Sequence, residues 1–304
     1  MRTVMHSYAL RDYPLEHVLR VAAAGAWQAI ELSSWHFDTE FGEESVRRGI
    51  ATAVETGRRC GVDIFCAGYW AVFTAPDDAE RKHWVEKACR VIDACAATGI
   101  GLVNGAGGWL VRDARDWDDD WTANGSAMAT EADLERVAEC YRHIAGYAAD
   151  HGVRVAVEVH PNTVHDTVAA TARLIDLVAH DNLLVTIDPA NAAVLSVADR
   201  DPAVVDPIAG RVAYFHLKNC LIRDGVADFT VDAAAGVVDN YRWLARMSAL
   251  PQVTAVCVEY CGDGDPHPRL AAARSYLRDT LRLVSLTAPT ARSQSARSQS
   301  APPG

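Results

Sequence analysis

Four short apolar segments in the second half of the chain each end in an acidic residue or a histidine. The first covers residues 153–158 and is rich in β-branched residues, as expected of a strand buried on both faces of a parallel sheet. The others cover residues 183–188, 212–216 and 253–259. In chain order the four segments end in Glu158, Asp188, His216 and Glu259. Because a charge is costly in a hydrophobic core, these ends indicate a site rather than packing.

Segments with strand character alternate with segments of helical spacing along most of the chain. Four further strands are predicted at residues 3–8, 28–32, 62–66 and 101–104. Helices are predicted at residues 14–25, 44–60, 77–98, 130–150, 163–179, 236–248 and 267–286, with a less regular segment before residue 212. Eight strands and about eight helices in this order predict an α/β fold, a single (β/α)8 TIM barrel over residues 1–286. A doubly wound open sheet is the alternative, but no G-x-G-x-x-G motif follows the first strand.

Two regions depart from this alternation. Residues 105–130 form a long connection with three tryptophans, Trp109, Trp117 and Trp121, and this composition favours a lid or a subunit contact over disorder. Residues 287–304 repeat the sequence Ala-Arg-Ser-Gln-Ser and end in Pro-Pro-Gly, which predicts a disordered, low-complexity tail that is dispensable for chemistry.

Composition excludes several classes of partner. The 304 residues include 40 acidic and 29 basic side chains, and the net charge of −11 argues against nucleic acid or an anionic membrane as the main partner. No apolar run reaches the roughly 18 residues of a membrane span. The eight cysteines form no C-x-x-C pair, and the first residues lack a signal-peptide pattern. We therefore expect a cytoplasmic protein with reduced thiols that acts on a small molecule, either as a monomer or as a homo-oligomer.

The four strand ends predict a metal site. Active sites of TIM barrels lie at the carboxyl-terminal ends of the strands, and consecutive strands are neighbours, so the four side chains can meet. Three carboxylates and one imidazole suit Mn²⁺ first, with Mg²⁺, Co²⁺ or Zn²⁺ as alternatives. Any one of these residues could be an ordinary strand-end cap or salt-bridge partner, but all four together favour one divalent ion.

The motifs around these residues resemble those of the xylose-isomerase-like TIM barrels, also called sugar phosphate isomerases/epimerases. The resemblance spans about residues 3–286 and is carried by the motifs Val-Glu-Val-His at 157–160, Ile-Asp-Pro-Ala-Asn at 187–191, Phe-His-Leu-Lys-Asn at 215–219 and Val-Glu-Tyr at 258–260. It implies one divalent metal held by Glu158, Asp188, His216 and Glu259. In the ketose 3-epimerases of this family, the two glutamates also move protons on either face of the substrate.

The chain departs from the ketose 3-epimerases at two positions. These enzymes commonly carry a histidine three residues after the ligand aspartate, where this chain has Asn191. They also carry an arginine six residues after the ligand histidine, where this chain has Ile222. The resemblance therefore implies the fold and the metal site more directly than it implies the reaction.

Further candidates lie next to the four ligands. His160 and Lys218 each follow a ligand by two residues, which by strand alternation points them to the same side. They are candidate acid/base or substrate-contacting groups; the alternatives are a histidine that caps the next helix and a lysine in a salt bridge to a ligand carboxylate. Five residues at other strand ends and loops are expected to bind substrate: His6, Trp35, His36, Trp109 and Asn191.

The leading hypothesis is a metal-dependent isomerase or epimerase of a sugar, keto-sugar or cyclitol that acts through an enediolate. The alternative is a lyase or dehydratase that uses the same metal site, in which His160 or Lys218 supplies the second acid/base group. An abasic-site endonuclease would need more strand-end histidines and a basic groove, and the acidic balance disfavours it. A non-catalytic barrel is disfavoured by the intact set of four ligands.

Overall fold

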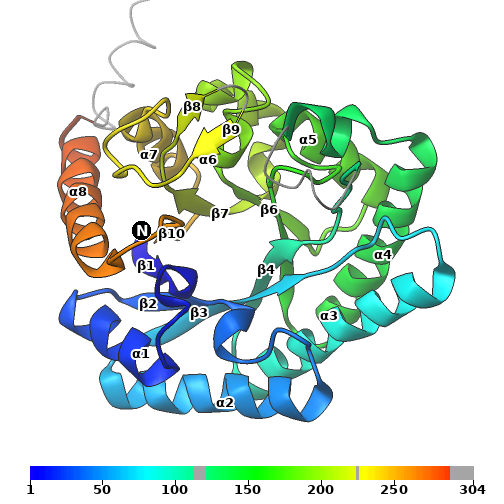
Figure 1. The fold of residues 1–304 in the computed structure, drawn as a ribbon, viewed down its shortest axis with the longest axis horizontal. Coiled ribbons are helices and arrows are strands. Elements are labelled where there is room, and N and C mark those ends of the chain that lie inside the picture. The colour runs from blue at the N-terminus through cyan, green and yellow to red at the C-terminus, as the bar shows by residue number, and fades with distance from the viewer. Residues whose placement is uncertain (113–120, 224–225, 288–304) are drawn as a thin grey trace, which may run out of the picture.

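Eight parallel strands close into a barrel in the computed structural model, which describes residues 1–112, 121–223 and 226–287 (Figure 1). Around the barrel the strands follow the order β1, β10, β7, β6, β5, β4, β3, β2. Their bounds are β1 Arg2–His6, β2 Ala29–Leu32, β3 Asp63–Trp70, β4 Leu102–Ala106, β5 Arg154–Glu158, β6 Leu183–Ile187, β7 Val212–Leu217 and β10 Ala255–Val258. The predicted TIM barrel is confirmed, and β5, β6, β7 and β10 lie side by side in one half of it.

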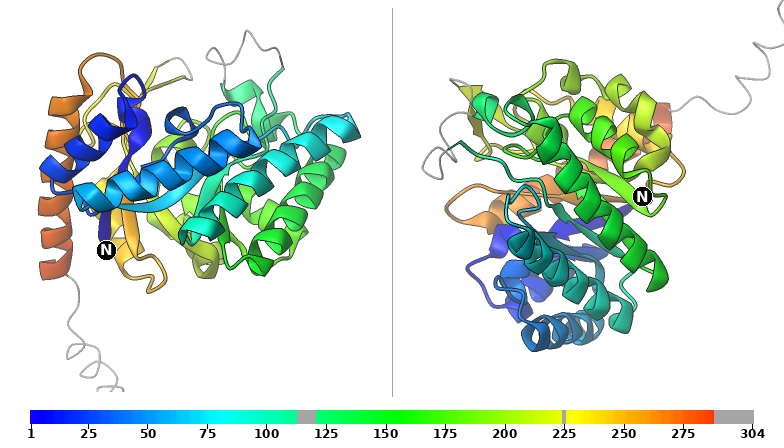
Figure 2. Two further views of the ribbon diagram at one scale, coloured as in Figure 1. Left: turned by 90° about the horizontal axis from the view of Figure 1, so that it is seen from below. Right: turned by 90° about the vertical axis from the view of Figure 1, so that its right-hand side faces the viewer.

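Helices pack around the outside of the barrel (Figure 2). They are α1 Leu15–Ala24, α2 Glu43–Cys60, α3 Asp78–Thr98, α4 Glu131–Asp150, α5 Val168–Val178, α6 Pro189–Ala192, α7 Asn240–Ser248 and α8 Pro266–Thr287. The 3₁₀ helices are η1 Ser7–Leu10, η2 Ser34–His36, η3 Trp121–Ala123, η4 Gly125–Ala127, η5 Ala198–Arg200 and η6 Pro202–Arg211. Gly61 and Gly99 end α2 and α3 with φ angles of 71° and 79°, because glycine adopts this left-handed conformation without strain.

The strict alternation of strands and helices breaks down on either side of β7. After β6, α6 has only four residues, and η6 continues the path to β7. Pro207 inside η6 lacks the N–H that a regular α-helix requires. The sequence predicts a polar loop over residues 219–235, whereas the structure adds an antiparallel hairpin there, β8 Leu221–Arg223 and β9 Val226–Asp228. The loop prediction overlooked a local signal, because the two strands flank an Asp-Gly pair at residues 224–225 in the sequence.

Two tryptophans of the connection after β4, Trp109 and Trp121, contact neighbouring loops. Trp109 forms an isolated bridge with Thr163, in the loop after β5. Trp121 is 7% exposed and stacks on Phe229, which follows the β8–β9 hairpin, with a centroid separation of 5.8 Å. Trp117 and the low-complexity residues 288–304 lie outside the described residues.

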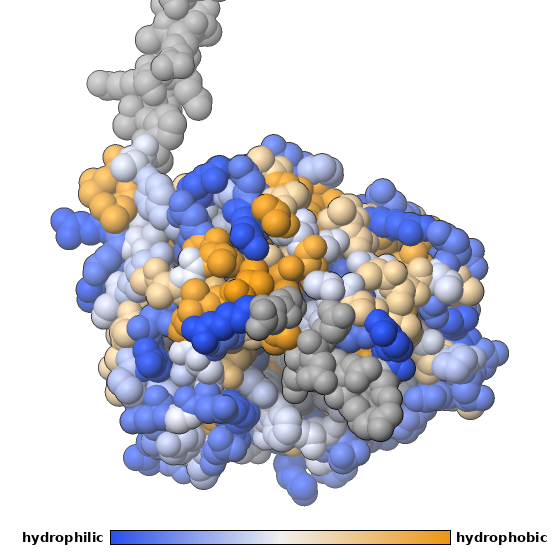
Figure 3. Space-filling view, turned by 45° about the horizontal axis from the view of Figure 1, so that its top comes forward, coloured by the Kyte–Doolittle hydropathy of each residue, from blue (hydrophilic) through white to orange (hydrophobic). Residues whose placement is uncertain are grey.

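An apolar layer fills part of the barrel interior. One buried cluster there comprises Val4, Ala29, Cys66, Leu102, Ala156, Tyr214, Ala255 and Cys257. The eight cysteines are unpaired, as predicted. Within the described part of the chain, no helix combines the length and the apolar character needed to cross a membrane. Hydrophilic side chains dominate the edges of the face shown in Figure 3, and hydrophobic ones gather near its centre.

Candidate metal centre

Four side chains from adjacent strands converge at one end of the barrel. Glu158 is the last residue of β5, Asp188 follows β6, His216 lies in β7, and Glu259 follows β10. One ligand atom of each lies within 4.8 Å of the others. The predicted convergence is therefore observed, and it follows from the parallel strand order, which brings the four strand ends to the same edge.

Asp188 is fixed by the start of α6. Its Oδ1 accepts hydrogen bonds from the backbone N–H groups of Ala190 and Asn191, both at 3.0 Å. Pro189 occupies the first helical position, where its missing N–H costs nothing. This N-cap uses one carboxylate oxygen and leaves Oδ2 facing the centre.

Asn191 lies against the candidate ligand Glu158. Its Nδ2 donates to Glu158 Oε1 at 3.2 Å and to the Val159 carbonyl at 3.1 Å. Asn191 is 1% exposed. The residue that the sequence suggested for substrate binding therefore holds Glu158 in place.

His216 lies at the middle of the cluster and is fully buried. Its Nδ1 is 3.4 Å from Glu158 Oε1, 3.4 Å from Glu259 Oε2 and 3.8 Å from Asp188 Oδ2. Among the described residues, neither His216 Nδ1 nor Asp188 Oδ2 has a partner in hydrogen-bonding geometry. His216 Nδ1, buried among three carboxylates without a hydrogen bond, fits a bound cation, since buried polar groups are otherwise hydrogen-bonded. Asp188 Oδ2, by contrast, has an ion pair with Lys218 Nζ at 3.0 Å.

Lys218 forms the salt bridges that the sequence analysis had posed as an alternative. Its Nζ lies 2.6 Å from Glu259 Oε2 and 3.0 Å from Asp188 Oδ2. The ring of Phe229 covers the ammonium group at 4.8 Å. An ammonium in this position offsets part of the repulsion between two ligand carboxylates.

Burial and the neighbouring charges shift the pKa values of the residues at the centre in opposite directions. Burial raises the pKa of Asp188 to about 6, although the Lys218 ammonium opposes the shift. Burial acts the same way on Glu259, but Lys218 and His6 hold the pKa of Glu259 well below its ordinary range. Burial lowers the pKa of His216, yet Glu31 and Glu158 outweigh it and raise that pKa well above the ordinary value. The centre thus stabilises positive charge, which is what a divalent cation requires.

His160 lies just beyond the ligands. Its ring is 4.7 Å from that of Trp109 in an edge-to-face arrangement, and its Nδ1 lies 2.9 Å from the carbonyl oxygen of Pro161. Burial lowers the pKa of His160, while the neighbouring Glu158 opposes this shift. His160 and Trp109 therefore share one wall of the site, next to Glu158.

The remaining predicted residues lie on the β1–β2 side. The ring of His6 is 5.7 Å from that of His216. His36 Nε2 is bound to the Ser7 carbonyl oxygen at 3.0 Å. Trp35 is 58% exposed and lies 6.3 Å from the ring of Tyr8. The structure therefore brings His6 next to His216, whereas His36 is bound to the backbone of η1 and Trp35 is exposed to solvent.

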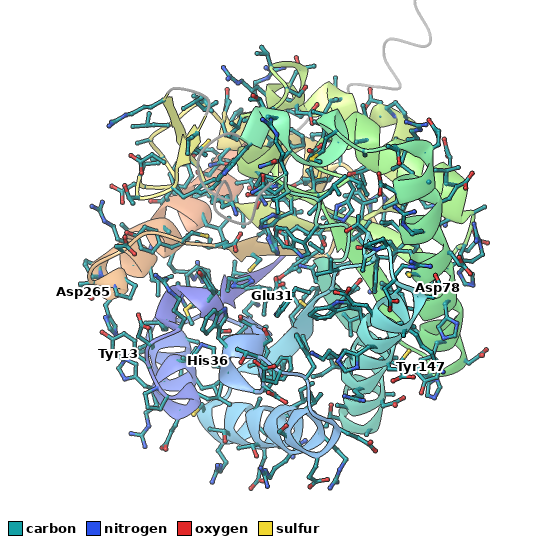
Figure 4. The ribbon with its side chains drawn as sticks, turned by 45° about the vertical axis from the view of Figure 1, so that its right-hand side comes forward. Tyr13, Glu31, His36, Asp78, Tyr147 and Asp265 are labelled. Carbon is teal, nitrogen blue, oxygen red and sulfur yellow. The ribbon has the colours of Figure 1, made fainter. Side chains whose placement is uncertain are left out.

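Two buried polar residues were missed by the sequence analysis. Glu31 Oε2 lies 2.8 Å from His216 Nε2, and Asn104 Nδ2 donates to Glu31 Oε1 at 2.8 Å. Figure 4 shows Glu31 in the middle of the barrel. The signal was available, because Glu31 is a charge within the short apolar strand β2.

A closed eight-stranded barrel with acidic and histidine side chains at its strand ends defines a class of barrel proteins built to hold a metal ion. The sequence profile of the family described as "Xylose isomerase-like TIM barrel" matches residues 18–280. The chain belongs to this family. No curated protein has a sequence that matches this one significantly.

Several solved structures share this fold. The probable 3-DHS dehydratase AsbF from Bacillus anthracis is 17% identical, with a TM-score of 0.70 over 91% of this chain and 99% of that one. The D-allulose 3-epimerase from Methylomonas sp. is 13% identical, with a TM-score of 0.72 over 92% and 98% of the two chains. The IOLI protein with a bound zinc atom is 12% identical, with a TM-score of 0.74 over 93% and 99%. At these identities the similarity establishes the fold.

Proposed function

We propose that this protein is a divalent-metal-dependent isomerase or epimerase of a sugar, keto-sugar or cyclitol. One observation carries the proposal: the four candidate ligands differ in their access to solvent. The side chains of Asp188 and His216 are 0% exposed, whereas those of Glu158 and Glu259 are each 11% exposed. Asp188 and His216 are therefore out of reach of a substrate and would serve as metal ligands alone, while the two glutamates can also reach a substrate.

The chemistry follows from this division of roles. Removal of a proton next to a carbonyl group places negative charge on oxygen. A divalent cation at this centre would offset that charge. One glutamate, ionised at the start, takes the proton from the substrate carbon. The other, which first takes up a proton from solvent or from a substrate hydroxyl group, gives that proton to the resulting enediolate. The low pKa of Glu259 keeps its carboxylate ionised, as a base must be. Transfer between two separate carboxylates allows the configuration at carbon to change.

A lyase remains the second candidate because of Lys218. The Lys218 ammonium is buried against Glu259 at 2.6 Å, next to the proposed reaction site. From this position Lys218 could donate a proton to a departing hydroxyl group once a carboxylate has removed the neighbouring carbon-bound proton. A solved structure with the same fold carries the name dehydratase. The metal and the four ligands would be the same in either reaction.

Incubation with ketohexoses, ketopentoses and keto-cyclitols in D₂O tests both candidates. Epimerisation or isomerisation through proton abstraction incorporates deuterium at carbon and leaves the carbon skeleton and oxygen count unchanged. Dehydration instead yields a product lighter by one water. NMR and mass spectrometry of the products separate these outcomes, and a chain that turns over no member of the panel with Mn²⁺, Mg²⁺, Co²⁺ or Zn²⁺ contradicts the proposal.

Glutamate variants test the proposed roles. Glu158→Gln and Glu259→Gln should each lower kcat by about 10²- to 10⁴-fold, the usual contribution of an acid/base group, while circular dichroism shows an intact fold. Glu135, exposed on α4, provides the matched control, because Glu135→Gln changes the same functional group far from the centre. Full activity in either centre variant would remove the assignment of that glutamate.

A further inference from the structure

Three polar side chains form a layer inside the barrel directly beneath the candidate ligands. Glu31, Asn104 and Thr186 come from β2, β4 and β6 and are 1%, 1% and 0% exposed. Alternate strands of a TIM barrel contribute side chains to one layer, and branched apolar residues usually fill it. Polar groups buried this deeply are normally hydrogen-bonded. The partners of these three side chains therefore indicate what the side chains do.

The three residues form a chain of hydrogen bonds that ends on a ligand. Thr186 Oγ1 donates to Asn104 Oδ1 at 2.6 Å, which fixes the orientation of the Asn104 amide. Asn104 Nδ2 then donates to Glu31 Oε1 at 2.8 Å and lies 3.4 Å from Glu158 Oε2. The other oxygen of Glu31, Oε2, lies 2.8 Å from His216 Nε2. The chain therefore touches two of the four candidate ligands from below.

The contact with Glu31 decides which nitrogen of His216 faces the ligand cluster. An ionised carboxylate only accepts hydrogen bonds, so His216 Nε2 must carry a proton and donate it to Glu31. The Nδ1 atom, which lies 3.4 Å from both Glu158 and Glu259, is then the nitrogen whose lone pair can bind a cation. Histidine ligands of metals are commonly held in this way by a carboxylate on the opposite nitrogen.

We propose that Glu31 is a positioning residue for the metal centre: it holds His216 with Nδ1 directed at the metal, and Asn104 and Thr186 hold Glu31. This inference rests on the metal centre of the proposed function. Because Asn104 also approaches Glu158, the same layer sets the spacing of two ligands. Glu31 touches neither substrate nor metal in this role, so it acts on metal affinity through His216.

Zinc affinity is the direct readout. Zn²⁺ is titrated into the metal-free full-length chain in competition with a chromogenic chelator. Glu31→Gln should weaken zinc binding by about ten- to a hundredfold, the usual effect of losing such a partner. Thr186→Val, which removes only the distal hydroxyl, should weaken it less. Asp199→Asn is the matched control, because Asp199 is also a buried, hydrogen-bonded carboxylate but holds the start of α5 instead.

The wild-type chain gives a second readout that does not depend on whether the variants fold. In zinc-loaded protein labelled with ¹⁵N-histidine, His216 should carry its proton on Nε2 and bind zinc through Nδ1. A proton on Nδ1 overturns the inference, as does Glu31→Gln protein that folds and binds zinc with wild-type affinity. A wild-type chain that binds no zinc, manganese, magnesium or cobalt would instead overturn the metal centre and the proposed function with it.

Discussion

Glu31 and Asp166 are equally buried, at 1% exposure each, yet their carboxyl groups are perturbed in opposite directions. Burial alone raises the pKa of a carboxyl group. For Glu31 the neighbouring His216 and His6 outweigh burial and hold the pKa well below the ordinary range. For Asp166 burial dominates and raises the pKa to about 6.

Their partners explain the difference. Glu31 faces two histidines and the amide of Asn104. Asp166 Oδ2 accepts from the backbone N–H of Ser126 in the loop after β4, and among the described residues Asp166 Oδ1 has no partner in hydrogen-bonding geometry. The partners of Glu31 in the barrel interior thus stabilise its ionised form next to the candidate metal centre. Asp166, next to the loop after β4, lacks such partners and is protonated more easily.

The largest loss of stability is expected when the Lys218 ammonium is removed from the candidate metal centre. Lys218→Met leaves Asp188 and Glu259 buried without their ammonium partner, and breaking such a pair costs about 3–5 kcal/mol. Urea unfolding of the metal-free variant measures the loss. A divalent cation should restore more stability to this variant than to the wild type, because it supplies the missing positive charge; equal gains would argue against a shared site.

Metal removal should have the next largest effect. A metal present at a hundred times its Kd stabilises the folded state by about 2.7 kcal/mol, which corresponds to a Tm shift of several degrees. Differential scanning calorimetry before and after dialysis against a chelator measures this shift. His216→Asn removes a ligand and should abolish the shift, whereas Asp166→Asn should preserve it. Retention of the shift in His216→Asn would place the metal elsewhere.

The raised pKa of Asp166 predicts a pH dependence of stability that the lowered pKa of Glu31 does not. Its folded-state pKa of about 6 lies above the ordinary 3.8, so the folded protein binds this proton more tightly than the unfolded chain does. This contribution to stability is present below about pH 4 and is lost as the pH rises through about 6. Asp166→Asn should therefore gain stability relative to wild type, by up to about 3 kcal/mol, between pH 4 and 7.

Parallel urea titrations of the wild type and Asp166→Asn at both pH values test this prediction. Subtraction removes the contributions of all other carboxylates, which the two proteins share. A stability difference that does not change with pH would show that Asp166 is ionised in the folded protein throughout this range.

The smallest loss of stability is expected when the exposed ion pair between Asp265 and His267 is broken. Asp265 Oδ1 lies 2.7 Å from His267 Nδ1, the same chemical pairing as Glu31 and His216, but the Asp265 side chain is 68% exposed. Exposed pairs contribute about 0–1 kcal/mol, because water solvates both partners. Asp265→Asn should change the Tm by no more than a degree or two, and it should leave zinc affinity unchanged. A large effect on zinc affinity would mean that the protein has a further metal site at its surface.

Much of the fold was predictable from local patterns. Apolar β-branched runs predicted the barrel strands, and helical spacing with terminal glycines predicted most of the helices, because both depend on neighbouring residues. The less regular segment predicted before residue 212 agrees with the four-residue α6 and the 3₁₀ helix η6, whereas the β8–β9 hairpin was not predicted. The hairpin strands are mostly apolar and flank an Asp-Gly pair in the sequence, so a local signal existed, but the strands are only three residues long.

The sequence by itself determined the four candidate ligands, since strand order and strand ends follow from the alternation of elements along the chain. Only the tertiary structure decided how they are held. Asn191 lies on Glu158, Lys218 bridges Asp188 and Glu259, and Glu31 meets His216 across the barrel from 185 residues away in the chain. Such contacts depend on barrel closure and side-chain direction, which no local pattern encodes. The charge of Glu31 within an apolar strand was a local signal, but its contact with the candidate ligand His216 could be assigned only from the closed barrel.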